Sequence, residues 1–114
     1  MNLLLFIIIK KNNKMDEEEE YISVYTKTGT GFQTHPYVQC EADVFIDGKK
    51  IGKTSAGGAR RGGGLCGIRI RNGRKLDIGV EETSGRRLSL KGFIADGTYN
   101  TVIFNFTTSE VDIY

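Results

Sequence analysis

The sequence predicts an all-β domain: a small antiparallel β-sandwich of about seven or eight strands, with a small barrel as the alternative. Three observations lead to this prediction. Apolar and polar residues alternate in several short stretches, dipeptides that contain Gly and favour turns separate those stretches, and no stretch shows the 3.6-residue period of an amphipathic helix. A chain of 114 residues is long enough for one domain with one modest core.

The clearest alternation runs over residues 38–46. One face is apolar and the other is mostly polar, as in a strand with one side buried. The apolar face holds Val38, Cys40, Ala42, Val44 and Ile46, and the other face holds Gln39, Glu41, Asp43 and Phe45. The dipeptide Asp47-Gly48 follows and predicts a hairpin into residues 49–54.

Residues 48–54 also approach the pattern of a phosphate-binding loop, whose backbone N–H groups wrap a phosphate. That motif needs four residues between its glycines, whereas three separate Gly48 from Gly52. It should also open a helix, but the Gly-rich segment 56–64 that comes next has no periodicity. We therefore interpret residues 48–54 as part of a hairpin.

Further short strands are expected along the chain, ending with an edge strand. Their ranges are 21–26, 49–54, 65–71, 76–80, 88–90, 99–107 and 111–113. Their predicted inward residues are Ile22, Val24, Cys66, Ile68, Ile70, Leu76, Ile78, Val80, Leu88, Leu90, Val102, Phe104 and Phe106. A loop over residues 72–74 would join two of these strands in a hairpin, with Ile70 facing Leu76.

Residues 1–20 are expected to form an extension, and residues 21–114 a single β-sandwich domain. The apolar run Leu3–Ile9 is too short to span a membrane, so no membrane span is expected. It precedes the basic segment 10–14, which reverses the order found in a secretory signal peptide, and no small-residue cleavage site follows. Localisation stays open, with synthesis in the cytoplasm and no secretion favoured.

The residue types of segment 1–14 are those that codons rich in A and T encode. One interpretation is that this segment is translated upstream DNA and that Met15 is the natural start. The alternative is a short hydrophobic strand or anchor that belongs to the protein. The acidic run Glu17–Glu20 that follows is typical of a solvated tail.

The predicted hairpin, VFIDGKKIGKTS, resembles the hairpin of PEGA-type β-sandwich modules, which carry a pattern like V-x-V-D-G-x-x-x-G-x-T-P. The matching residues are Val44, Ile46, Asp47, Gly48, Gly52 and Thr54. Ser55 stands where that family has Pro, and the downstream Pro-Gly turn of those modules is missing. The resemblance covers residues 44–55 and implies a small non-enzymatic module found in cell-envelope and surface proteins, often within larger architectures.

Cys40 and Cys66 both fall on predicted inward faces. They could form a disulfide between the sheets, as in immunoglobulin-type sandwiches, or remain buried free thiols that behave as small apolar groups. Without a signal peptide, free thiols are favoured. A catalytic cysteine with His35 as its base is disfavoured because Cys40 faces the predicted core.

Nothing else in the sequence points to catalysis. The single His and the scattered carboxylates offer no metal cluster and no acid–base pair. We therefore expect no enzymatic activity and no cofactor.

Basic residues are concentrated in residues 49–91, where twelve Lys and Arg stand against three carboxylates, a net charge of +9. Such a segment can bind a nucleic acid or another polyanion. The candidate residues are Arg60, Arg61, Arg69, Arg71, Arg74 and Lys75. No aromatic residue interleaves these charges as base stacking would require. Solvated surfaces and edge-strand Lys explain most of them.

The functional expectation is a non-catalytic β-sandwich module with a structural or binding role, of the kind that decorates a surface, an envelope or a virion. Its expected partner is another protein or a second copy of the chain. The alternative is polyanion or nucleic-acid binding through the basic Gly/Arg loop and the adjacent basic hairpin.

Overall fold

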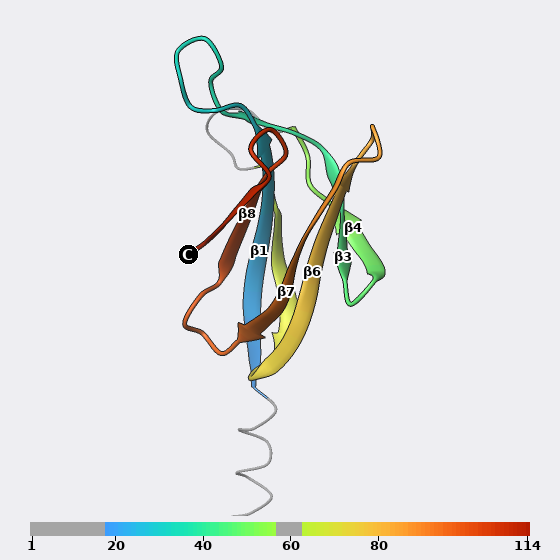
Figure 1. Ribbon diagram of the computed structural model, residues 1–114. Helices are drawn as coiled ribbons and strands as arrows, with labels where there is room; N and C mark the ends of the chain where they lie inside the picture. The colour runs from blue at the N-terminus through green and yellow to red at the C-terminus, as the bar shows by residue number, and fades with distance from the viewer. Residues whose placement is uncertain (1–17, 57–62) are drawn as a thin grey trace, which may run out of the picture.

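The computed structural model describes residues 18–56 and 63–114, which contain nine β-strands and no helix (Figure 1). The strands are β1 (Glu19–Thr28), β2 (Val38–Gln39), β3 (Ala42–Ile46), β4 (Lys49–Lys53), β5 (Leu65–Arg71), β6 (Arg74–Glu82), β7 (Arg87–Ala95), β8 (Thr101–Asn105) and β9 (Glu110–Ile113). No helix in these ranges is long and apolar enough to cross a membrane. The all-β prediction is confirmed.

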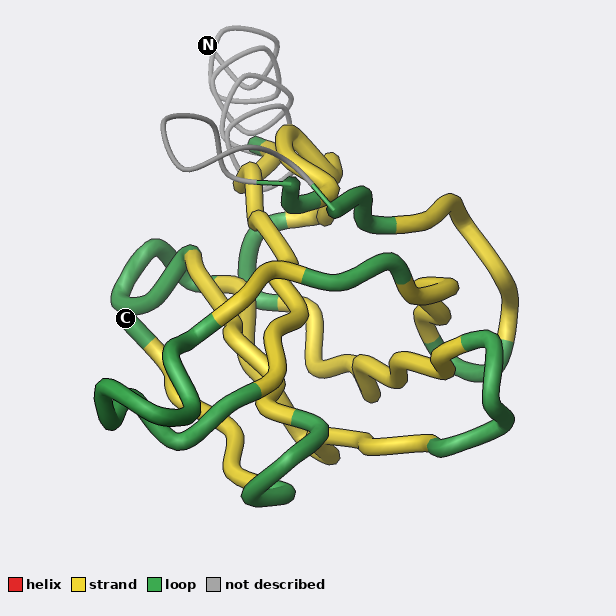
Figure 2. Tube along the Cα trace, turned by 90° about the horizontal axis from the view of Figure 1, so that it is seen from above, coloured by secondary structure: helices red, strands yellow, loops and turns green. Residues whose placement is uncertain are grey.

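The strands form two sheets. The first sheet has five strands, with β1 in the middle. One edge of β1 pairs with β8, which in turn pairs with β9. The other edge of β1 pairs with both β2 and β5. The second has four strands in the order β4-β3-β6-β7. The view from above in Figure 2 shows the two groups of strands on opposite sides of a shared interior. The architecture is a β-sandwich in the general sense.

A single apolar core lies between the sheets. The first sheet contributes Ile22, Val24, Ile70, Val102 and Phe104, with Phe106 directly after β8, and the second contributes Ala42, Val44, Ile46, Leu76, Ile78, Val80, Phe93 and Ala95. Most of these residues were predicted from the alternation alone. Because both sheets bury one face, the period-two pattern was a reliable guide to which side chains point inward.

The predicted hairpin at Asp47-Gly48 is confirmed. Asp47 and Gly48 both have positive φ, 50° and 82°, as a two-residue turn between twisted strands requires, and they join β3 to β4. A further hairpin, whose turn contains Gly85 at φ 93°, joins β6 to β7. The hairpin interpretation of residues 48–54 therefore replaces the phosphate loop, and β4 ends in coil at Thr54.

The predicted strand over residues 38–46 is wrong in one respect, because it is two strands in different sheets. β2 pairs with β1, whereas β3 pairs with β4 and β6. Val38, predicted to be buried, is 55% exposed. This split raises the strand number to nine.

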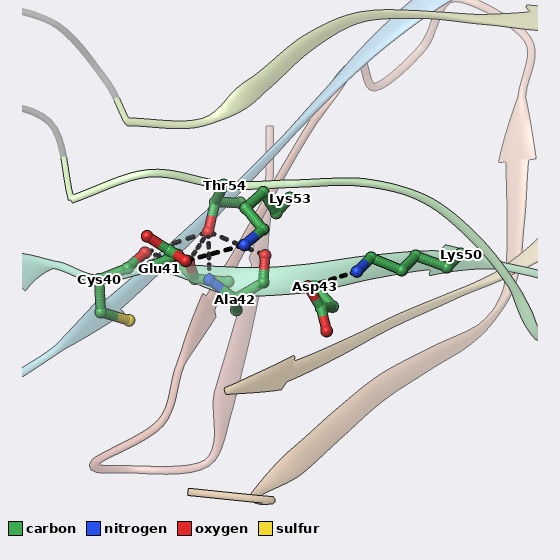
Figure 3. A network of polar contacts seen from close by, with 8 residues as sticks. Cys40, Glu41, Ala42, Asp43, Lys50, Lys53 and Thr54 are labelled. Carbon is green, nitrogen blue, oxygen red and sulfur yellow. Dashed lines mark hydrogen bonds and ion pairs between the residues drawn. The ribbon is translucent and has the colours of Figure 1, made fainter. Parts of the chain in front are cut away.

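The crossover between β2 and β3 is stabilised by buried hydroxyl groups (Figure 3). Oγ1 of Thr26 lies 2.7 Å from the carbonyl oxygen of Cys40 and 2.6 Å from Oγ1 of Thr54. Thr54 Oγ1 also lies 3.0 Å from that carbonyl and accepts a hydrogen bond from the backbone N–H of Ala42 at 2.9 Å. Backbone groups that leave a sheet ladder inside a protein need other partners, and the two threonines supply them.

The predicted hairpin between residues 65–71 and 76–80 is also wrong. β5 belongs to the first sheet and β6 to the second, so the chain turns a corner across the core. The corner is hydrogen-bonded to both sheets. On the side of the first sheet, the Asn72 N–H donates to the carbonyl of Glu18, directly before β1, at 2.7 Å. On the side of the second sheet, the Gly73 N–H donates to the carbonyl of Ala95 in β7 at 2.7 Å. The two apolar faces meet across the core instead of lying side by side in one sheet.

β5 contains a bulge, and the bulge reverses the prediction for Cys66. Between the pairs Ile22–Ile68 and Val24–Leu65, one residue of β1, Ser23, stands opposite two residues of β5, Cys66 and Gly67. Gly67 adopts φ 69°, and Cys66 points to the exposed side. One extra residue is enough to exchange the two faces of a strand.

One strand pair departs from the predicted antiparallel arrangement. β8 runs parallel to β1, with Val102 beside Val24. The connection after β7 crosses from the second sheet to the first, and β8 therefore enters the first sheet in the same direction as β1. The acidic run is also partly structured, since β1 begins at Glu19. The interpretation of residues 1–14 lies outside the described residues.

Candidate functional site

The predicted basic residues lie on both sides of the corner between the sheets. Arg69 and Arg71 are exposed on β5, alternating with the buried Ile70. Arg74 and Lys75 are exposed at the start of β6 in the other sheet. Arg60 and Arg61, the remaining candidates, lie outside the described residues.

Carboxylates from outside residues 49–91 neutralise much of the basic charge. Four cations of the segment pair with such carboxylates: Lys50 with Asp43 at 3.2 Å, Lys53 with Glu41 at 3.0 Å, Arg69 with Glu19 at 2.8 Å and Arg74 with Asp47 at 2.5 Å. Within the segment, Arg86 pairs with Glu82 and Arg87 with Glu81. The segment with a net charge of +9 therefore does not form a uniformly basic surface.

Arg74 has a structural partner at this end of the sandwich. Asp47 Oδ1 accepts a hydrogen bond from the Asp77 N–H at 2.8 Å, while Oδ2 binds Arg74. The bond from the Asp77 backbone, followed by the hydrogen bond and charge of Arg74, holds the pKa of Asp47 below its ordinary value. Asp47 thus fixes the β3–β4 turn against β6, and Arg74 is engaged in that contact.

Arg69 has an aromatic neighbour that the sequence order conceals. Tyr21 stands directly opposite Arg69 in the β1–β5 pair and is 58% exposed. Arg71 is opposite Glu19 in the same pair. No aromatic residue interleaves the basic residues along the sequence, but Tyr21 lies beside Arg69 in the structure, because strand pairing joins residues far apart in the chain.

A depression in the surface brings Arg69 and Arg74 to one rim. It has a volume of about 410 Å³ and lies between the edge strands β4 and β5. Its lining combines apolar and basic side chains, among them Ile46, Ile51, Leu65, Ile68, Ile70, Lys49, Arg69 and Arg74. Both arginines that line it are already paired with carboxylates.

Both cysteines are free thiols in the structure. Cys40 is half-buried against the core, and burial raises the pKa of its thiol. Cys66 is exposed, so the expected pair of buried thiols is wrong for this residue. Its Sγ lies 3.4 Å from the Tyr25 hydroxyl, and this hydrogen bond raises the pKa of Tyr25. Among the described residues no three potential ligands are grouped to hold a metal ion.

Among the described residues, the most exposed large apolar side chain lies in the connection between β1 and β2. We call residues 29–37 the β1–β2 loop; it projects beyond the end of the strands and is drawn blue-green in Figure 1. Phe32 near its tip is 71% exposed. The His35 carbonyl accepts hydrogen bonds from Thr30 N–H at 2.9 Å and Gly31 N–H at 3.0 Å, and His35 N–H donates to the Phe32 carbonyl at 2.9 Å.

The β1–β2 loop is tied to β8 and depends on two glycines. Gly29 N–H donates to Thr107 Oγ1 at 2.8 Å, and Asn105 Nδ2 donates to the Gly29 carbonyl at 2.9 Å. Gly29 has φ +100°, and a Cβ there would lie 2.1 Å from the Pro36 carbonyl oxygen. Gly31 has φ +87°, and its Cβ would lie 2.6 Å from the Tyr37 ring. Only Gly fits this backbone, so the sequence specifies the loop shape.

Sequence reasoning left this region between the predicted strands 21–26 and 38–46 and overlooked Phe32. A usable signal was present: two glycines two positions apart, followed by an aromatic residue, in a segment 28–39 without any Asp, Glu, Lys or Arg. That combination is typical of a shaped loop that presents one apolar side chain.

Fold and surface together define a small two-sheet β-sandwich with an aromatic loop at one end and a mixed-charge corner at the other. Comparison of the chain with models of known families, with curated proteins and with solved structures finds no match.

Proposed function

We propose that the protein is a non-catalytic β-sandwich module of the Ig-like or PEGA-like kind, with a structural or binding role of the type found on a surface, an envelope or a virion. The two-sheet fold with one small core supports this proposal. In such folds the sheets act as a scaffold, and the loops at the ends of the sandwich make the recognition contacts.

The observation that carries the proposal is the presentation of Phe32. Its ring is 71% exposed, while the loop backbone around it is fixed by hydrogen bonds and by Gly29 and Gly31. Aromatic side chains dominate the energetics of protein–protein contacts, and a preorganised loop loses little conformational entropy on binding. The partner is therefore a protein surface with a recess that accepts an aromatic ring.

Site-specific photo-cross-linking tests this proposal. A benzophenone amino acid in place of Phe32, in cells that produce the protein, is expected to give a discrete protein adduct. The matched control carries the same amino acid in place of Ile94 of β7, which is 49% exposed and lies outside the loop. Equal labelling at both positions, or no adduct at position 32, would reject the loop as the contact element.

Polyanion binding is a second candidate, supported by one specific observation. Among the described residues Arg71 and Lys75 have no ion-pair partner, and Tyr21 lies opposite Arg69. A Tyr beside Arg side chains on a sheet face is suited to stacking a base and contacting its phosphate.

The salt dependence of binding tests this candidate. Replacing Arg71 and Lys75 together with Ala should weaken binding to heparin and single-stranded oligonucleotides and lower the salt slope by about one to two units. A double Ala variant of Arg60 and Arg61 should do the same. Arg87→Ala is the control, since Arg87 is engaged with Glu81. If the unmodified protein shows no salt-sensitive retention at low ionic strength, the basic residues serve only as surface.

A further inference from the structure

The outer face of the second sheet carries a hollow centred on a glycine. Gly79 lies in the middle of β6, opposite Phe45 of β3 on one side and Ser89 of β7 on the other. A depression of about 500 Å³ opens there, and its lining includes Phe45, Gly79, Ser89 and charged side chains.

Gly79 is not needed for the backbone. Its φ lies outside the left-handed region, and a Cβ would meet only the Leu88 carbonyl oxygen and the Phe45 Cβ, both at the ordinary contact distance of 3.8 Å. Gly in the interior of a strand weakens the strand, and often marks a place where another group approaches the sheet closely. The missing side chain is what leaves the floor of the hollow open.

The charged groups around the hollow balance one another. Arg87 pairs with Glu81, and Asp77 Oδ1 accepts a hydrogen bond from the Gly92 N–H at 3.0 Å. Lys91 is the other cation of the lining, so two carboxylates stand against two cations. An uncharged occupant with an aromatic ring suits this site, since the ring can cover Gly79 and lie beside the ring of Phe45.

We propose that the occupant is Phe32 of a second copy of this chain, and that the protein assembles head to tail. This inference rests on the proposed function of the β1–β2 loop and names its partner. Segment 28–39 contains no Asp, Glu, Lys or Arg, which matches the balanced charge of the hollow. The loop supplies an exposed ring on a fixed backbone, and the hollow supplies a recess with one aromatic wall.

The two halves of this contact lie on different parts of the molecule. The β1–β2 loop extends past the end of the strands (Figure 1), whereas Gly79 lies in the middle of β6, paired with β3 and β7 in the second sheet. In the proposed head-to-tail assembly the contact is heterologous: each copy inserts its loop into one neighbour and offers its hollow to another. Such contacts generate rings or open chains, not closed two-fold dimers.

Two variants isolate the two halves of the contact. Phe32→Ala removes the donor ring, and Gly79→Val fills the hollow with a side chain that suits a strand. In sedimentation velocity the unmodified protein should gain mass with concentration up to about 1 mM, the range of weak specific contacts. Each variant alone should stay monomeric.

Mixing the variants gives the decisive result. Phe32→Ala keeps an intact hollow and Gly79→Val keeps an intact loop, so the mixture should form one-to-one heterodimers and nothing larger. Ser89→Tyr fills the hollow from β7 and serves as a second blocking variant if Gly79→Val alters folding. Ile113→Ala, an exposed apolar substitution in β9 of the first sheet, should assemble like the unmodified chain.

Each contrary outcome has a definite meaning. A monomer at about 1 mM, assembly that survives both blocking variants, or a mixture without heterodimers would overturn head-to-tail assembly. If assembly fails but position 32 cross-links to a different protein, the loop remains a contact element and only the identity of its partner is wrong. If both experiments fail, the proposed function fails as well.

Discussion

Replacing Phe104 with Ala is expected to lower the free energy of unfolding by about 3–5 kcal/mol, because the substitution leaves a cavity in the centre of the core. Phe104 is 0% exposed and lies in β8, which is paired on both sides by β1 and β9. Urea or guanidinium unfolding, followed by a spectroscopic signal of the sheet, measures this change.

The matched control is the same substitution at Phe32. This ring is solvent-exposed, so Phe32→Ala should change the free energy of unfolding by no more than about 0.5 kcal/mol. The measurement should be made at a concentration where the protein is monomeric, since assembly would add its own contribution. Similar losses at the two positions would show that the β1–β2 loop is part of the core.

Thr54→Val is expected to lower the free energy of unfolding by about 2–4 kcal/mol. This loss is expected although Val keeps the shape of the side chain and residue 54 lies at the end of an edge hairpin. Thr54 is completely buried, and its hydroxyl contacts the Ala42 N–H, the Cys40 carbonyl and Thr26 Oγ1. Removing it leaves buried polar groups short of partners, at about 1–3 kcal/mol for each group. Thermal or chemical unfolding checks the value.

Two further variants separate polarity from packing. Thr54→Ser keeps the hydroxyl and loses one methyl group, so it should lower the free energy of unfolding by only about 1 kcal/mol. The double variant of Thr26→Val and Thr54→Val should lose less free energy of unfolding than the two single variants together. Each single variant leaves the other hydroxyl without its partner, whereas the double variant removes both hydroxyls. Strict additivity would mean that the two hydroxyls do not form one network.

The alternation of residue types determined the core side chains of most strands. Ile22 and Val24 in β1 and Leu76, Ile78 and Val80 in β6 were assigned to the interior and are buried. This inference succeeds because side-chain direction in a strand follows from backbone geometry alone. It failed at Cys66, where one extra residue in a bulge reversed the alternation, and bulges have no pattern of their own.

The positions of the turns could also be predicted from the sequence, but the sheet that the chain enters after each turn could not. Asp47-Gly48 and Asn72-Gly73 are the same kind of dipeptide, yet the first closes a hairpin and the second carries the chain to the other sheet. The difference comes from the groups that receive the backbone: Asn72 bonds to Glu18 and Gly73 to Ala95. These partners lie far away in the sequence.

The candidate site shows the same division. Sequence counting found twelve basic residues in one segment, and tertiary structure set Glu19, Glu41, Asp43 and Asp47 against four of them. The presentation of Phe32 and the hollow at Gly79 both depend on neighbours from other strands. The sequence by itself determined the fold class, most of the inward residues and the positions of the turns, because local geometry controls those features. Sheet membership, the surface charge and the recognition surfaces were decided only by tertiary structure, because each arises from contacts between residues distant in the chain.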